Sequence, residues 1–479
     1  MKQLSILKVL PLIFLIFLFV ELCIQTVQGA EVKSIKHAGF TLEMAVKSAQ
    51  RNDPWLAGNR HTQDAYQSKS IAAGTLPDPK VNIGLANMPL DTFDFGQEGM
   101  TQFKVGVSQM FPRGESLALR QQQLELIAGQ YPFQREDRKA KIAVTTGQLW
   151  LDVYKAQESI ALIESNRALF DQLSDIAQAS YSAALGKSRQ QDIVRAQLEV
   201  TRIDDRLNVL EQQLDTGTQR LSQWTSHYFV GDFVGEFSND TRLDSSGGDV
   251  KLATPLPAIY LLHPELYVER QLQPQTLFEY FSHHPSVDAI EKSIQASSKG
   301  IELSKQKFKP EWGVNAGYGY RADDAMGNER ADLFTIGVSF DLPLFTSDKQ
   351  DREVQAAVSQ TESVKTRKWL RLREMMAAFG ATKAQLLRLD QRQHRYRTEL
   401  LPQMKDQSDA SLSAYTSDDG DFAEVVRALI AELNAQLDDL SIDVDIQKTK
   451  LQLNYFLMTN PDQIILSDNG VMESDGDKK

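Results

Sequence analysis

The two halves of this chain match each other at one constant offset of 231 residues, and this duplication restricts the folds open to it. Pro54 corresponds to Pro285, and Pro79 corresponds to Pro310. A single register that holds along most of both halves indicates two copies of one folding unit. The other residues of the first copy that are identical at this offset include Phe103, Gly106, Val107, Ser108, Pro112, Ala179, Ser180, Ser182 and Ala183.

Each copy is predicted to contain one helix, two strands and then two longer helices. Apolar residues at helical spacing, such as Ile193 and Val200, favour helices with one buried and one solvated face. We expect Gly129, Pro132 and Gly147 to kink or loosen the first long helix. The expected helices span about 41–74, 114–185 and 188–225 in the first copy and about 276–308, 347–416 and 421–459 in the second.

The first thirty residues have the layout of a secretory signal. Lys2 and Lys8 form a positive region before an apolar run over residues 10–20, and a small residue follows at Gly29. This run is short for a membrane span, so we expect a cleaved signal peptide over 1–29, with an uncleaved anchor as the alternative. The rest of the layout is a first repeat at 38–225, a linker or equatorial region at 226–275, a second repeat at 276–459 and a flexible acidic tail at 460–479.

Four segments alternate apolar residues with small or polar ones, which is the pattern of a strand whose two faces meet different surroundings. Two of them flank the polar residues 91–99, and the other two flank 321–331. Because the chain is predicted to be exported, we interpret them as outer-membrane β-barrel strands. A soluble sandwich with one buried face is the alternative. The apolar positions are Val81, Ile83, Leu85, Phe103, Val105, Val107, Trp312, Val314, Ala316, Tyr318, Tyr320, Phe334, Ile336, Val338 and Phe340.

Four strands are too few to close a membrane barrel, for which about eight is the minimum. An open sheet in lipid leaves backbone groups without partners along its edges. The strands therefore predict an oligomer that pools them. A helix of some seventy residues is about 105 Å long, so we expect the helices to project far from the membrane.

Composition and motifs argue against an enzyme or a nucleic-acid-binding protein. The formal net charge is −12, and basic residues form no long block. No phosphate-binding loop, nucleophile elbow or zinc motif appears. His283-His284 precedes a predicted helix at the position equivalent to Asn52-Asp53, so we interpret the pair as turn residues and not as metal ligands. We expect no catalytic residue, no cofactor and no resident metal.

The order of elements resembles that of the TolC family of outer-membrane efflux proteins over about residues 38–459. The segments with this resemblance are the Pro54 and Pro285 helix starts, Pro77-Asp78-Pro79, the strand exits at 106–112 and 337–343, and the predicted helix tips at 181–186 and 410–415.

This resemblance implies a passive exit duct of a tripartite efflux system in the outer membrane of a Gram-negative bacterium. The expected fold class is an α+β membrane protein with a duplicated unit, four β-barrel strands and long periplasmic helical hairpins in each protomer. Three protomers would form a twelve-stranded β-barrel and an α-helical barrel. The implied partners are two further copies, a periplasmic adaptor protein, an inner-membrane pump of the RND type and outer-membrane lipid.

The resemblance also implies a gate at the periplasmic helix tips. Asp192, Tyr415 and Glu424 match the family's gate positions, although Gly420 stands where the family pattern has an arginine and Arg427 stands where it has an acid. Ordinary polar turn residues are the alternative interpretation. The remaining expected residues of the gate and its turns are Asp418, Asp419, Asp421, Arg189 and Gly186.

Three methionines bear on the cargo. Met88, Met100 and Met110 lie in or beside the first pair of strands, and thioethers bind soft cations such as Cu(I). The sequence around them resembles heavy-metal efflux members of the family, which makes copper or another heavy-metal cation a candidate cargo. Drugs, dyes and secreted proteins are the alternatives, and the methionines would then only fill space.

Two other functions remain open at this point. A periplasmic coiled-coil adaptor would have the same long helices but no membrane span of its own. A self-sufficient diffusion porin would need more strands than the four that the sequence indicates.

Overall fold

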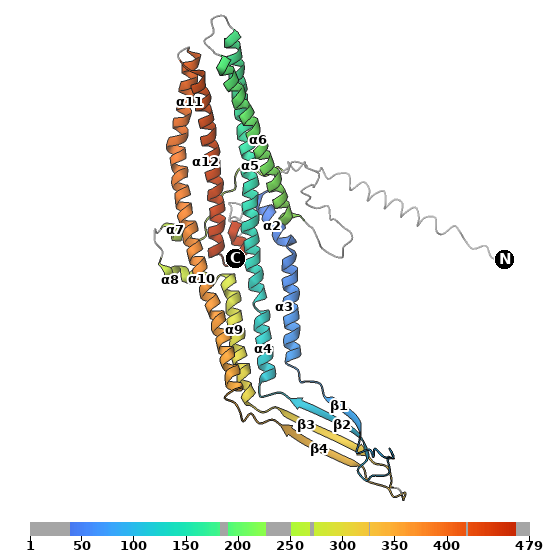
Figure 1. Cartoon of the computed structure of the whole chain (residues 1–479). Helices are drawn as coiled ribbons and strands as arrows, with labels where there is room; N and C mark the ends of the chain where they lie inside the picture. Colours follow the sequence, from blue (N-terminus) through green and yellow to red (C-terminus); the bar gives the residue numbers. More distant parts are fainter. Residues whose placement is uncertain are drawn as a thin grey trace, which may run out of the picture.

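The chain forms a long helical body with a four-stranded sheet at one end, seen in its computed structural model (Figure 1). The structure describes residues 39–182, 190–226, 251–268, 273–324, 326–417 and 420–465. The predicted signal peptide lies outside these residues, as does most of the predicted acidic tail. Among the described helices, none is both long and apolar enough to cross a membrane.

Proline and glycine set the helix boundaries in the first half. The expected first helix is two helices, because Asp53 ends α2 and caps α3, with Pro54 in its first turn. The first long helix breaks after Gly129, as predicted, but it continues without a break through Gly147. The bounds are α2 Leu42–Asn52, α3 Pro54–Ala73, α4 Ser116–Ala128, α5 Tyr131–Ser182 and α6 Gln190–Thr225.

The second half repeats this order with one difference in its long helix. A π-helical turn over Tyr396–Leu400 separates two α-helices, just before Pro402. Proline has no N–H to bond to the carbonyl one turn earlier, which disturbs the regular helix at this point. The bounds are α7 Glu265–Val268, α8 Pro274–Ser282, α9 Pro285–Lys305, α10 Gln350–Arg395, α11 Leu401–Thr416 and α12 Phe422–Leu457, with short 3-10 turns at Gln306–Phe308 and Pro461–Ile465.

The four predicted strands are confirmed, and they form one antiparallel sheet in the order β1-β2-β3-β4. The two hairpins, one from each half, meet between β2 and β3, where Val105 lies opposite Tyr318. Ile83 lies opposite Val105 on the other side, so the apolar residues of neighbouring strands share one face. The bounds are β1 Lys80–Ala86, β2 Gln102–Phe111, β3 Trp312–Tyr320 and β4 Leu333–Phe340.

The connector between the halves is described over 251–268, where it is mostly extended and ends in the short α7. Side-chain amide oxygens of the long helices accept hydrogen bonds from its backbone N–H groups. Leu252 N donates to Gln157 Oε1, Ile259 N donates to Gln447 Oε1, and both distances are 2.9 Å. Leu252 and Ile259 are themselves buried in the largest apolar core, beside Trp150. The connector is thus held to helices of both halves.

Close contact between α5 and α12 explains why residue 147 is a glycine. A Cβ atom at this position would lie 2.7 Å from Cδ1 of Leu451, a side chain that is fully buried. Real Cβ atoms do not come this near to a carbon atom, so either Leu451 or the helices would have to move. Gly147 therefore permits helix packing and does not serve as a kink.

We predict that Gly147→Ala destabilises the protein, although alanine favours helix. Overpacking at this contact should lower the free energy of unfolding by about 1–3 kcal/mol. Gly380→Ala in α10 is the matched control, since a Cβ there meets no other atom within 4 Å. It should raise the free energy of unfolding by about 0.5–1 kcal/mol. Thermal unfolding in detergent, followed by circular dichroism, measures both; a similar rise in both variants would contradict the packing explanation.

A buried polar network ties four helices together around His284, which caps α9 as the sequence predicted for a turn residue. His284 Nε2 donates to the Tyr455 carbonyl at 2.9 Å, and Nδ1 accepts from the Ser286 N–H at 3.1 Å. Arg371 donates to the Ser286 and Tyr455 hydroxyl oxygens, and Tyr455 donates in turn to Asp137 at 2.8 Å. Burial lowers the pKa of His284 to about 4, against a smaller opposing effect of Asp137.

The depressed pKa of His284 makes stability depend on pH in a defined direction. The folded chain keeps His284 neutral, whereas the unfolded chain takes up a proton below about pH 6.5. Stability from this site is therefore full above about pH 6.5 and falls as the pH drops toward 4. At pH 5 the loss should be on the order of 2 kcal/mol.

His284→Asn tests this effect, because asparagine also caps helices well. The decrease in unfolding temperature between pH 7.5 and pH 5 should be smaller in the variant than in the unaltered chain. His61→Asn, at an exposed histidine of α3, should leave that decrease as it is. The same decrease in all three proteins would show that His284 does not contribute to it.

Candidate functional site

The sheet has one apolar face, and that face is uncovered in the protomer. Alternation along each strand places every second side chain on it. Ile83, Phe334 and Ile336 expose 68%, 72% and 69% of their surface. Apolar patches of this extent on a protein surface mark a contact with lipid or with another protein.

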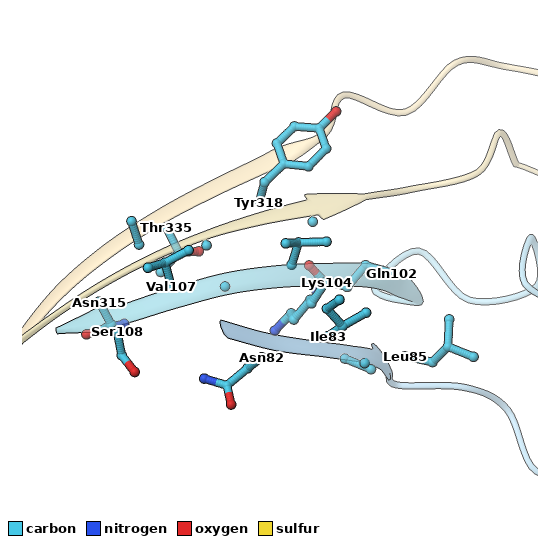
Figure 2. Close-up of a pocket in the computed structure, with 17 residues that line it drawn as sticks. Asn82, Ile83, Leu85, Gln102, Lys104, Val107, Ser108, Asn315, Tyr318 and Thr335 are labelled. Carbon is cyan, nitrogen blue, oxygen red and sulfur yellow. The ribbon is translucent and has the colours of Figure 1, made fainter. Parts of the chain in front are cut away.

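The opposite face is polar and rich in glycine (Figure 2). It borders a hollow of about 390 Å³ whose lining comes from all four strands. Asn82, Lys104 and Asn315 are among the polar side chains there, and Figure 2 shows Tyr318 pointing away from them. The two faces thus differ in the way expected for a sheet between lipid and water.

The outer strands of the sheet each have a free edge among the described residues. β1 pairs only with β2, and β4 pairs only with β3. Unpaired strand edges are a template for pairing with another strand, and in lipid they are not tolerated. The sheet is therefore suited to joining the sheets of further copies of this chain.

An ionic junction fixes the sheet to the helical body. Arg113, just after β2, donates to the Lys309 carbonyl at 3.0 Å and pairs with Asp341, just after β4. Asp341 Oδ1 also accepts from the Glu311 N–H at 2.7 Å, just before β3. These contacts hold three strand ends together. The sequence analysis missed them, because nothing near Arg113 indicates partners that lie 196 and 228 residues away.

At the other end of the body, Gly420 and Asp421 shape the turn between α11 and α12. A Cβ at Gly420 would lie 2.6 Å from the Tyr415 backbone nitrogen, so the turn has room only for glycine unless it opens. Asp421 is the N-cap of α12 and accepts from the Ala423 N–H at 3.2 Å. Asp421 therefore has a structural role here that its predicted gate role did not include.

The other predicted gate residues are placed in different surroundings. Asp192 is 6% exposed in the first turn of α6, whereas Glu424 and Arg427 are exposed on α12, 3.9 Å apart. The Tyr415 ring packs edge-on against Phe422, with the ring centroids 5.6 Å apart. Asp418, Asp419, Gly186 and Arg189 lie outside the described residues.

An apolar cluster at the tip brings the two helical hairpins together. Ala196 of α6 is buried with Phe422, Val425 and Val426 of α12, and Tyr415 packs against the cluster. The tip of one hairpin is thereby attached to the tip of the other within one protomer. The sequence analysis identified polar residues at this tip, and the structure adds an apolar cluster that joins the hairpins.

The three methionines lie in or beside the first strand pair, as the sequence predicted. Met110 lies on the polar face of β2, and Met88 and Met100 lie in the connection between β1 and β2. No group of three or more His, Cys, Asp or Glu side chains is arranged to hold a metal ion within the described ranges.

Comparisons with known proteins identify the fold. No protein-family profile matches the chain, and no curated protein sequence does. Solved structures match over most of their length. The outer-membrane channel OprN has a TM-score of 0.68 at 12% identity, covering 88% of this chain and 90% of that one. CusC, described in terms of transmembrane channel formation, has a TM-score of 0.65 at 12% identity, covering 87% and 91%.

A third neighbour agrees with these two. The CmeC outer-membrane channel of Campylobacter jejuni has a TM-score of 0.64 at 11% identity and covers 90% of this chain and 88% of that one. The TolC-like fold that the sequence predicted is confirmed, and the chain has the fold of these outer-membrane channels.

Proposed function

We propose that this chain is one protomer of the outer-membrane exit duct of a tripartite efflux system. The observation that carries the proposal is the two-faced sheet with open edges at the end of a long helical body. Its apolar face suits lipid, its polar face suits water, and its edges require further strands. The channel fold of OprN, CusC and CmeC supports the same function.

Three copies give twelve strands, which is enough to close a barrel around a water-filled lumen. The helices would then extend from a Gram-negative outer membrane into the periplasm, where a periplasmic adaptor and an inner-membrane pump, of the RND type, would dock. The chain acts as a passive conduit in this proposal and not as an enzyme, and the pump supplies the energy. A periplasmic adaptor without a membrane span would leave the apolar face of the sheet in water.

A charge on the apolar face should prevent insertion, whereas the same charge on the polar face should not. Ile336→Lys places an ammonium where lipid is proposed, at a cost of about 2–4 kcal/mol for each copy near the bilayer centre. Thr335→Lys, one residue earlier, is the matched control on the polar face. We expect Thr335→Lys to be extracted from outer membranes as a trimer and Ile336→Lys to be lost from that fraction.

The lipid-face variant also reports on transport. In a strain that lacks the gene, the unaltered protein should restore tolerance and Ile336→Lys should not, with copper, silver, zinc, detergents and antibiotics as the test compounds. The compound whose tolerance is restored identifies the cargo, heavy-metal cations included. Recovery of the unaltered protein from the periplasm without detergent would exclude the duct and favour the adaptor.

The tip residues are proposed as the gate of this duct. Asp192 is buried in the first turn of α6, and Glu424 lies in the first turn of α12 beside Arg427. Asp421 and Tyr415 lie on either side of the turn between α11 and α12. The gate roles of Asp418, Asp419 and Arg189 stay predictions.

Replacing the tip acids should loosen the gate. We expect Asp192→Ala and Glu424→Ala each to raise the single-channel conductance in planar bilayers. Glu211→Ala, at an exposed acid further along α6, is the control and should leave the conductance unchanged. Conductance equal to that of the unaltered protein in both tip variants would remove these residues from the gate.

A further inference from the structure

The polar face of the sheet has positive charge and no negative charge among the residues of the four strands. Its members alternate with the apolar ones and are aligned across the strands by the observed pairing. Lys80 and Lys104 are the two charged residues on this face. The others are Asn82, Gly84, Ala86, Gln102, Gly106, Ser108, Met110, Gly313, Asn315, Gly317, Gly319, Leu333, Thr335, Gly337 and Ser339.

Lys104, the third residue of β2, lies toward the β1–β2 connection on this face and has glycine on either side. It lies opposite Gly84 of β1 and Gly319 of β3, and Gly106 follows it on the same face of β2. No neighbouring Cβ atom covers it from these positions, and the residue is exposed. Figure 2 shows it beside Asn82, at the hollow of the polar face.

Neither lysine is neutralised by the part of the chain that the structure describes. The ion pairs of the protomer lie in the helices and at the strand ends, and none includes Lys80 or Lys104. An exposed ammonium without a carboxylate partner keeps its full charge toward whatever passes the face. Within a closed lumen, copies of this charge from each protomer would add together.

We infer that Lys104, with Lys80, makes the sheet part of the duct selective for anionic solutes over cations. The inference rests on the proposed function, since it needs the polar face to line a lumen. Carboxylates and other organic anions would be concentrated at Lys104, whereas bare cations would be repelled there. Lys104 is thus a specificity-determining residue, and anionic compounds are the class of cargo that the sheet favours.

Acidic residues in the strand connections also contribute to the electrostatic potential of the proposed lumen. Asp324 and Asp332 lie in the β3–β4 connection, where each accepts hydrogen bonds from its own loop. Hydrogen bonds from Asn328 lower the pKa of Asp324, and a hydrogen bond from Tyr318 lowers that of Asp332, so both stay ionised. Because such charges add a constant contribution, the measured quantity has to be the change between variants.

The second repeat provides a matched position. Thr335 occupies the place in β4 that Lys104 occupies in β2, at the same offset of 231 residues. Lys104→Glu reverses the charge, Lys104→Arg keeps it, and Thr335→Lys adds a third positive charge to the face, at the equivalent site. The variants therefore lower, keep and raise the positive charge of one face.

The reversal potential in planar bilayers under a KCl gradient tests the inference. Lys104→Glu should decrease the chloride-to-potassium permeability ratio by at least about fivefold, since lumen charges of this kind change the potential by several kT. Lys104→Arg should keep the ratio, and Thr335→Lys should increase it. The differences should become small near 1 M salt, where the screening length is about 3 Å.

The results separate this inference from the proposed function. Channels that open in every variant with one permeability ratio would overturn the role of Lys104 and leave the duct intact. Purified protein that inserts and forms no channel in any variant would overturn both. If Lys104→Glu alone fails to assemble, Thr335→Lys still tests the inference. An unchanged chloride-to-potassium permeability ratio in Thr335→Lys would contradict it.

Discussion

The rest of the structure depends on the unsatisfied backbone at the two edges of a small apolar sheet. β1 and β4 each present N–H and C=O groups along one side, and lipid offers these groups no hydrogen bonds. In the proposed duct, strands from other copies complete the sheet at both edges. Arg113 and Asp341 join the strand ends to one another, and Arg113 also bonds to the Lys307 carbonyl in the turn after α9, so the sheet is tied to the helical body there.

Apolar packing and polar bonds both hold the helical body together. The apolar cores lie in the middle of the body and at the tip, where Ala196 and Phe422 join the two hairpins. Within the second half, the bonds of His284, Ser286, Arg371 and Tyr455 form a directional set of contacts, which Tyr455 extends to Asp137 of the first half. Buried networks of this kind specify one arrangement of helices more strictly than apolar contacts do.

The sequence predicted the elements of the fold better than their contacts. Strict alternation, as in Val81 to Leu85, was sufficient for the four strands, and proline and glycine were sufficient for the break after Gly129. Gly147 was misinterpreted as a kink, because the sequence does not indicate that Leu451 faces it across two helices. His284 was predicted as a turn residue, yet its bond to a carbonyl at Tyr455 depends on tertiary structure.

The candidate site was predictable to a different extent at its two ends. The two faces of the sheet follow from alternation alone, and the lysines on the polar face were visible in the sequence without being singled out. At the helix tip the residue types were predicted from a family resemblance. The sequence did not indicate that Asp192 would be buried or that Asp421 would serve as a helix cap.

The connector has a consequence for the evolutionary history of the duplication. Its backbone is bonded to Gln157 from the first copy and to Gln447 and Asn454 from the second. A chain reduced to either copy would lose some of these acceptors, and each buried N–H left without one costs about 1–3 kcal/mol. A single copy with the present sequence would therefore be less stable at the connector than the duplicated chain, and this cost favours keeping the two units in one polypeptide.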